Sequence, residues 1–93
     1  MQYPKIKYVE AISDYRLFII FENGAIKIYS LKKLLNEPGF TALKDENLFF
    51  KVKKEKNGYG LIWNDEIDLS EYEVWKNGIS VSSINKLTEK ISG

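Results

Sequence analysis

The sequence predicts a small α+β domain, in which an N-terminal three-stranded antiparallel meander is followed by a second β-hairpin and short helices. Three observations lead to this class. β-Branched and aromatic residues fill the first thirty positions in runs separated by turn residues. Leucines then recur at helical spacing, and a helix-capping motif stands at residues 70–73. We expect one domain over residues 1–78 and a C-terminal extension over 79–93, because a chain of 93 residues supports a single core.

The meander is predicted by three runs of strand-forming residues. The first two, Lys5 to Ala11 and Arg16 to Phe21, are separated by Ser13-Asp14, whose side chains favour turns. The second run leads into Asn23-Gly24, a pair suited to the positive φ angles of a tight two-residue hairpin. Alternation then resumes from Ala25 to Tyr29, so we expect a third strand there.

Short helices should follow the meander. Three leucines have helical spacing behind a Ser30 cap, and Pro38-Gly39 ends that segment. Asp45 is placed to cap a second short helix, after which Phe50 to Lys56 fits either a helix end or a strand. Asn57-Gly58 predicts the turn of the second hairpin, whose returning strand is residues 61–63.

The clearest local signal is the capping box at Ser70-Glu71-Tyr72-Glu73. Its serine accepts from the amide of Glu73, whose carboxylate reaches back to the serine amide. The helix should run from about Glu71 to Asn77 and close at Gly78 in the left-handed conformation. In the extension, Ser83 to Ile91 fits a short amphipathic helix, with Ile84, Leu87 and Ile91 on one stripe, that needs a surface to lie on.

Composition excludes several classes of protein. The 14 lysines and arginines nearly balance 13 acids, which leaves no surplus positive charge for a nucleic-acid backbone. The chain has no cysteine, so disulfides, thiolate zinc sites and thiol nucleophiles are excluded. Its N-terminus lacks the apolar run of a signal peptide, and the longest apolar run is far too short to cross a bilayer. We expect a cytoplasmic protein.

The same residues leave little for catalysis. There is no histidine, which removes the commonest general base and metal ligand. Asp65, Glu66 and Asp68 could hold calcium or magnesium, but their spacing does not reproduce a calcium loop. A turn at Asn64-Asp65, with Asp68 before a helix N-terminus, explains these acids better. We therefore expect no enzyme, and no catalytic, cofactor-binding or metal-binding residue.

The aromatic residues divide into core and surface candidates. Phe18, Phe21, Phe40 and Phe49 stand where core positions are expected. The two tryptophans flank the acidic turn, and tryptophan supplies large contact areas in protein interfaces. The candidate partner-binding residues are therefore Trp63, Asn64, Asp65, Glu66, Asp68 and Trp75.

An ordered series of short motifs resembles a known family. The series is Asp14-Tyr15-Arg16-Leu17, Phe21-x-Asn23-Gly24, Phe40-x-x-Leu43, Phe49 and Trp63-Asn64-Asp65-Glu66-Ile67-Asp68-Leu69. It is similar to the prokaryotic domain-of-unknown-function family numbered 2442, from about Ile6 to Gly78. The resemblance implies a compact α+β domain, found alone or joined to a helix-turn-helix segment, with no established activity. Genes for such domains often lie beside one for another small protein, an arrangement similar to toxin–antitoxin pairs.

Two functions follow as hypotheses. The first is a non-enzymatic protein-binding module, with an antitoxin-like role toward a small neighbouring protein. The alternative is a nucleic-acid accessory, indicated by the lysines at 51, 53, 54 and 56 and by aromatic residues Phe50 and Tyr59 that would stack on bases. An edge strand that carries lysines against unwanted pairing explains the same run, and the balanced charge disfavours nucleic acid. Homo-oligomerisation stays open.

Overall fold

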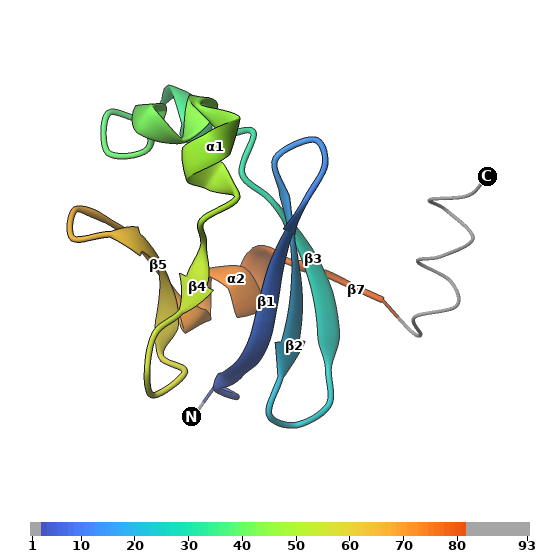
Figure 1. Cartoon of the computed structure of the whole chain (residues 1–93). Helices are drawn as coiled ribbons and strands as arrows, with labels where there is room; N and C mark the ends of the chain where they lie inside the picture. The colour runs from blue at the N-terminus through green and yellow to red at the C-terminus, as the bar shows by residue number, and fades with distance from the viewer. Residues whose placement is uncertain (1–2, 82–93) are drawn as a thin grey trace.

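Two antiparallel sheets and the short helices that join them make up the computed structural model of the chain, which describes residues 3–81 (Figure 1). The predicted α+β class and the N-terminal meander are confirmed. No helix among these residues is long and apolar enough to span a membrane. The elements in chain order are β1 (Ile6–Ile12), β2 (Arg16–Phe21), β3 (Ile26–Ser30), η1 (Leu34–Asn36), η2 (Thr41–Lys44), α1 (Glu46–Phe49), β4 (Lys53–Lys54), β5 (Gly60–Asn64), β6 (Ile67–Ser70), α2 (Glu71–Asn77) and β7 (Ile79–Ser80).

The first sheet has the strand order β1-β2-β3-β7, so β2 is covered on both edges. Its turn at Asn23-Gly24 differs from the expected two-residue hairpin. The amide of Phe21 donates to the carbonyl of Ala25, which encloses a three-residue loop, and only Gly24 in this loop has a positive φ angle. The Asn23 side chain instead accepts from the amide of Ala25 at 3.0 Å. A three-residue hairpin loop needs only one residue with a positive φ angle, whereas the expected two-residue loop needs two.

The second sheet has three strands, in the order β4-β5-β6, where the sequence predicted a hairpin. The predicted turn at Asn57-Gly58 is present between β4 and β5. The additional strand β6 returns from the acidic turn and pairs with β5 from Asn64↔Ile67 to Gly60↔Ser70. Asp68 therefore lies inside a strand that was not predicted, and this strand leads directly into α2, so the acid does precede a helix N-terminus as expected. A strand of four residues with a charge in it gives only a weak sequence signal.

Of the two caps predicted for the helical segment between the sheets, only the one at Asp45 is present. The side chain of Ser30 accepts from the amide of Lys32, but the 3₁₀ turn η1 begins after Lys33 and has no side-chain cap, so the prediction for Ser30 was wrong. Asp45 caps α1 by accepting from the amide of Asn47 at 3.0 Å, as predicted. The 3₁₀ turn η2 was not predicted. Together these turns close one end of the space between the two sheets (Figure 1).

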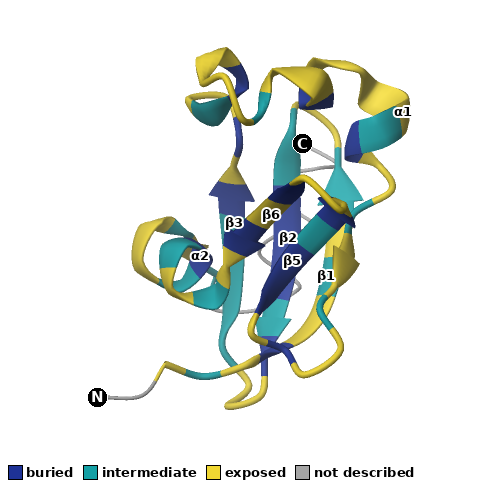
Figure 2. Cartoon of the chain, turned by 90° about the vertical axis from the view of Figure 1, so that its left-hand side faces the viewer, coloured by how far each residue is buried: buried dark blue, intermediate teal, exposed yellow. Residues whose placement is uncertain are grey.

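The core lies between the sheets. Figure 2 looks through the second sheet toward the first, and strands of both sheets carry residues coloured as buried. The first sheet contributes Leu17, Ile19, Phe21 and Tyr29, the second contributes Leu61, Trp63, Ile67 and Leu69, and α2 contributes Val74. Of the four phenylalanines expected here, Phe21 and Phe49 belong to the core and Phe40 packs against it. Phe18 lies on the opposite face of β2, because neighbouring strand residues point to opposite faces.

Helix α2 begins and ends where predicted, but its caps differ in detail. The Ser70 hydroxyl accepts from the amide of Glu73 at 3.1 Å, which confirms half of the capping box. The Glu73 carboxylate accepts instead from the Tyr29 hydroxyl at 2.9 Å and from the Asn77 amide group at 2.8 Å. Gly78 is extended, with φ −73°, so the predicted left-handed closure was wrong. A side chain there would meet the carbonyl of Val74 at 2.5 Å, which explains the glycine by close approach.

After α2 the chain returns to the first sheet. Ile79 pairs with Ile28 and Ser80 with Lys27, and the amide of Val81 donates to the carbonyl of Ile26 at 2.9 Å. The predicted C-terminal extension, 79–93, thus starts as a fourth strand. The amphipathic helix predicted for 83–91 lies outside the described residues.

Candidate functional site

The acidic turn sits at the tip of the β5–β6 hairpin. The Asn64 side chain accepts from the amide of Glu66 at 2.8 Å and from that of Ile67 at 2.9 Å, so this residue holds the turn together. Asp65 and Glu66 are exposed at the tip. Among residues 3–81, no three acidic, histidine or cysteine side chains are grouped as metal ligands. The tip is therefore a solvated turn, and the side chain of Asn64 stabilises it through these two hydrogen bonds.

Trp63 is a core residue, which corrects its place among the candidate partner contacts. Only 5% of its surface is exposed, and its indole nitrogen donates to the carbonyl of Phe49 at 3.0 Å. This bond joins β5 to the end of α1. Because the ring is enclosed by the fold, it is not accessible to a partner of the folded domain.

Trp75 is half-buried and points toward the first sheet. Its ring packs edge-on against Phe21, with 5.0 Å between centroids, and the ammonium of Lys27 lies 4.1 Å from the ring centroid. Lys27 also donates to the backbone carbonyl of Trp75. These contacts dock α2 on the inner face of β2 and β3. The predicted patch of two tryptophans around the acidic turn is therefore not assembled.

Three exposed tyrosines instead come together at the start of α2. Tyr3 and Tyr72 have ring centroids 4.7 Å apart, and the amide of Glu71 donates to the carbonyl of Tyr59 at 3.1 Å. The exposed fractions of Tyr3, Tyr59 and Tyr72 are 37%, 54% and 39%. Two lysines lie over the rings, Lys5 4.9 Å from the centroid of Tyr59 and Lys76 5.4 Å from that of Tyr72. We call these three tyrosines and two lysines the tyrosine surface.

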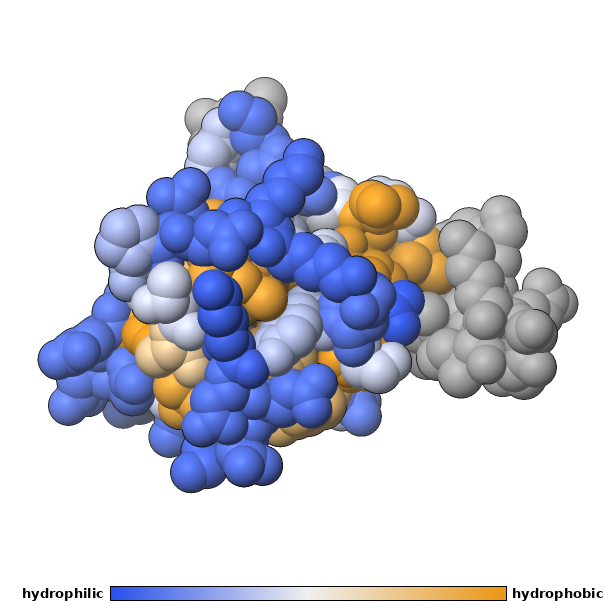
Figure 3. All heavy atoms as spheres, turned by 90° about the horizontal axis from the view of Figure 1, so that it is seen from above, coloured by the Kyte–Doolittle hydropathy of each residue, from blue (hydrophilic) through white to orange (hydrophobic). Residues whose placement is uncertain are grey.

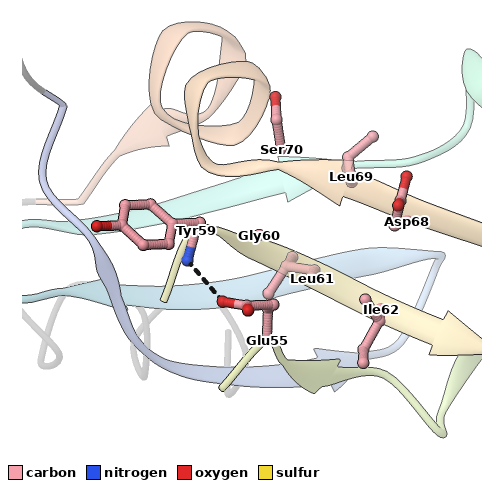
Figure 4. Close-up of a pocket in the computed structure, with 8 residues that line it drawn as sticks. All are labelled: Glu55, Tyr59, Gly60, Leu61, Ile62, Asp68, Leu69 and Ser70. Atoms are coloured by element: carbon pink, nitrogen blue, oxygen red, sulfur yellow. Dashed lines mark hydrogen bonds between the residues drawn. The ribbon is translucent and has the colours of Figure 1, made fainter. Parts of the chain in front are cut away.

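A shallow groove of about 320 Å³ adjoins Tyr59 (Figure 4). Two carboxylates line it from opposite sides of β5, Glu55 from the end of β4 and Asp68 from β6. Glu55 also accepts from the amide of Tyr59, which ties the acid to the turn that carries the tyrosine. Gly60 also lines the groove, and the backbone of β6 approaches it so closely that a side chain there would meet the Leu69 carbonyl at 2.6 Å. The other lining residues are Leu61, Ile62, Leu69 and Ser70.

Glu71 gives this region an unusual electrostatic feature. Its Oε2 atom is buried without a hydrogen-bond partner in the described part of the chain. Burial raises the pKa of the Glu71 carboxyl; Lys5 acts in the opposite direction, and the charge of Glu55 adds to the rise. A buried acceptor without a donor makes the negative charge of this carboxylate costly, which agrees with the direction of the pKa shift.

The sequence did not reveal the tyrosine surface because its members come from three separate segments. Tyr3 precedes β1, Tyr59 lies in the β4–β5 turn, and Tyr72 is in α2. Only the pairing of the strands and the docking of α2 bring them together. Of the predicted site residues, Asp68 lies in the adjoining groove, and Asp65 and Glu66 are exposed at the far end of the hairpin.

The chain belongs to the family described as protein of unknown function DUF2442, whose model matches residues 6–80. The resemblance in the ordered motifs is thereby confirmed, and the match includes strand β7. No curated protein and no solved structure matches the chain. Family membership supplies no activity, so the function has to be argued from the surface of the domain.

Proposed function

We propose that the domain is a non-enzymatic protein-binding module that holds its partner at the tyrosine surface and the adjoining groove. The observation that carries the proposal is the gathering of Tyr3, Tyr59 and Tyr72, each more than a third exposed, on one surface. Tyrosine combines a large apolar ring with a polar hydroxyl and loses little side-chain entropy on binding, which makes it frequent among the residues that dominate interface energies.

The groove favours a partner that presents a basic side chain beside an apolar one. Two carboxylates, those of Glu55 and Asp68, line its sides. A lysine or arginine from the partner would pair with these acids while the tyrosines cover its apolar neighbours. The charges would raise the association rate, and the rings would lengthen the lifetime of the complex.

The resemblance to the family adds a finer proposal about the identity of the partner. We propose a small protein encoded by the adjacent gene, toward which this domain acts as an antitoxin-like binder. This part is supported only by the gene arrangement that the resemblance implies, and the binding surface is argued without it.

The test is co-expression of the full chain with the protein encoded beside its gene, followed by pull-down and titration. We expect Tyr59→Ala and Tyr72→Ala each to weaken the complex by about tenfold or more, which is typical of central interface tyrosines. Tyr8→Ala is the matched control, because Tyr8 is 45% exposed but lies on the first sheet. A confirmed complex that both variants leave unchanged would remove this surface from the proposal.

Two further comparisons separate the alternatives. Asp68→Lys should weaken binding and Asp65→Lys should not, because Asp68 lines the groove and Asp65 does not. If Asp65→Lys weakened binding and Asp68→Lys did not, the site would be at the tip of the acidic turn instead. Expression of the neighbour alone and with this chain tests the antitoxin role. Capture without relief of toxicity would reject that role and keep the binding module.

A nucleic-acid accessory is the second candidate, and one observation favours it. Lys51, Lys53 and Lys54 are exposed near the short edge strand β4, between Phe50, which is 52% exposed, and Tyr59. Binding of this kind depends on counterion release and weakens steeply with salt. Titration with single-stranded oligonucleotides at two salt concentrations decides the matter, since binding that is absent or insensitive to salt would reject this candidate.

A further inference from the structure

The outer face of the first sheet, which points away from the second sheet, is apolar. Its centre consists of two rows of side chains that cross all four strands: Glu10, Phe18, Ile28 and Ile79 in one, and Tyr8, Ile20, Ile26 and Val81 in the other. All of them except Glu10 are apolar. None belongs to the core between the sheets, including Phe18, which is buried.

Such a face is unusual for an antiparallel sheet that meets solvent, because the solvated face normally carries polar residues. Tyr8 is 45% exposed and Ile79 is 74% exposed, at opposite edges of the sheet. Seen from above, hydrophobic side chains reach the surface on the right-hand side of the molecule, where Figure 1 places the first sheet (Figure 3). A continuous apolar surface of this kind marks a contact site.

We infer that residues 83–91 of this same chain occupy the face as an amphipathic helix. The chain leaves β7 at Val81, which already belongs to one of the two apolar rows. The segment that follows places Ile84, Leu87 and Ile91 on one helical stripe and polar residues elsewhere. A helix that follows an edge strand so closely can reach only the near surfaces of that sheet, and the inner face is filled by the core.

The dimensions agree with this occupant. A helix of nine residues is about 13.5 Å long. Four strands at the usual spacing are about 14 Å wide, and β1, β2 and β3, which have five to seven residues each, are about 17–23 Å long. The helix therefore lies within the face whether it crosses the strands or runs along them. Its tether also gives it a local concentration on the order of millimolar, which no separate molecule at cellular concentration matches.

This docking is independent of the tyrosine surface, because α2 and the groove lie on the inner side of the first sheet and on the second sheet. It assigns a role to the C-terminal extension. The segment covers apolar surface that would otherwise be available for self-association, and it ties the extension into the domain.

The test is nuclear Overhauser spectroscopy on the isotope-labelled full chain. We expect contacts from the methyl groups of Ile84, Leu87 and Ile91 to the rings of Phe18 and Tyr8, unchanged on dilution. Leu87→Asp should abolish these contacts and accelerate amide exchange of residues 84–91 by about tenfold or more. Asn85→Asp is the matched control, since it adds the same charge away from the stripe. It should keep both the contacts and the slow amide exchange.

Every other result counts against the inference. Absence of the contacts in the unmodified chain would overturn it. Contacts seen only between differently labelled chains in a mixed sample would also overturn it, and would assign the face to a second copy.

Discussion

Replacement of the buried Trp63 by phenylalanine should destabilise the domain without removing any exposed surface. The change takes away the hydrogen bond of 3.0 Å from the indole to the Phe49 carbonyl and leaves space where the larger ring was. The carbonyl keeps the amide of Val52 at 3.4 Å, so the lost bond costs about 1 kcal/mol. The smaller ring adds about 1–2 kcal/mol through lost contacts and the residual cavity.

The expected sum, about 2–3 kcal/mol, is large beside the 5–15 kcal/mol that stabilises a typical domain. For a chain of this size it corresponds to a fall in Tm of about 10–20 °C. Urea unfolding followed by circular dichroism measures the difference directly. The m-value should stay constant, because the two proteins expose nearly the same surface on unfolding.

Fluorescence quenching provides the second arm, since the chain has two tryptophans. Trp75→Phe leaves Trp63, which should be shielded from acrylamide, whereas Trp63→Phe leaves the half-buried Trp75, which should be quenched more. A loss of stability below 0.5 kcal/mol, or a Trp63 as accessible as Trp75, would refute the assignment of Trp63 to the core and return it to the candidate surface.

Three more substitutions test other parts of the fold. Gly58→Ala should cost about 2–3 kcal/mol in urea unfolding, because Gly58 has φ +82° and a side chain there would meet the Ile6 carbonyl at 2.7 Å; Gly39→Ala, with open space around it, should change little. Tyr29→Phe should cost about 1–2 kcal/mol in the same assay by removing the bond to Glu73 that ties β3 to α2. Glu71→Gln should stabilise the domain at pH 7, because the raised pKa of Glu71 means that the fold disfavours its charged form, which glutamine lacks. The stability that the protonated acid contributes is present below the unfolded pKa and is lost as the pH rises through the folded pKa. The gain should vanish as the pH falls to about 4, and a gain that is equal at both pH values would contradict this explanation.

Signals that depend on a few neighbouring residues were sufficient for much of the fold. The meander, the caps at Asp45 and Ser70 and the start of α2 were predicted, because each depends on side chains and backbone within one turn or strand. Strand β6 was missed, since its stability comes from pairing with β5 rather than from its own residues. The return of Ile79 and Ser80 to the first sheet depends likewise on a partner strand distant in sequence.

The candidate site was harder to predict because burial is a property of the whole fold. Trp63 and Trp75 both flank the acidic turn in the sequence, yet one ring is buried and donates to the end of α1, and the other packs against Phe21. Alternation alone also left open which face of β2 is inside. The core takes Leu17 and Ile19, and Phe18 is directed to the other face.

The arrangement of the first sheet explains why this small domain has two separate candidate contact surfaces. Its inner face is covered by the second sheet and by α2, so the tyrosine surface can only form beyond that layer, around Tyr59 and Tyr72. Its outer face is formed by the alternate residues of the same strands, among them the paired Phe18 and Ile28. Substitutions that share no contacts have additive effects in general. Leu87→Asp and Tyr72→Ala should therefore act independently, the first on the docking of the C-terminal segment and the second on the partner. A coupling between them would mean that the segment reaches the inner side of the sheet.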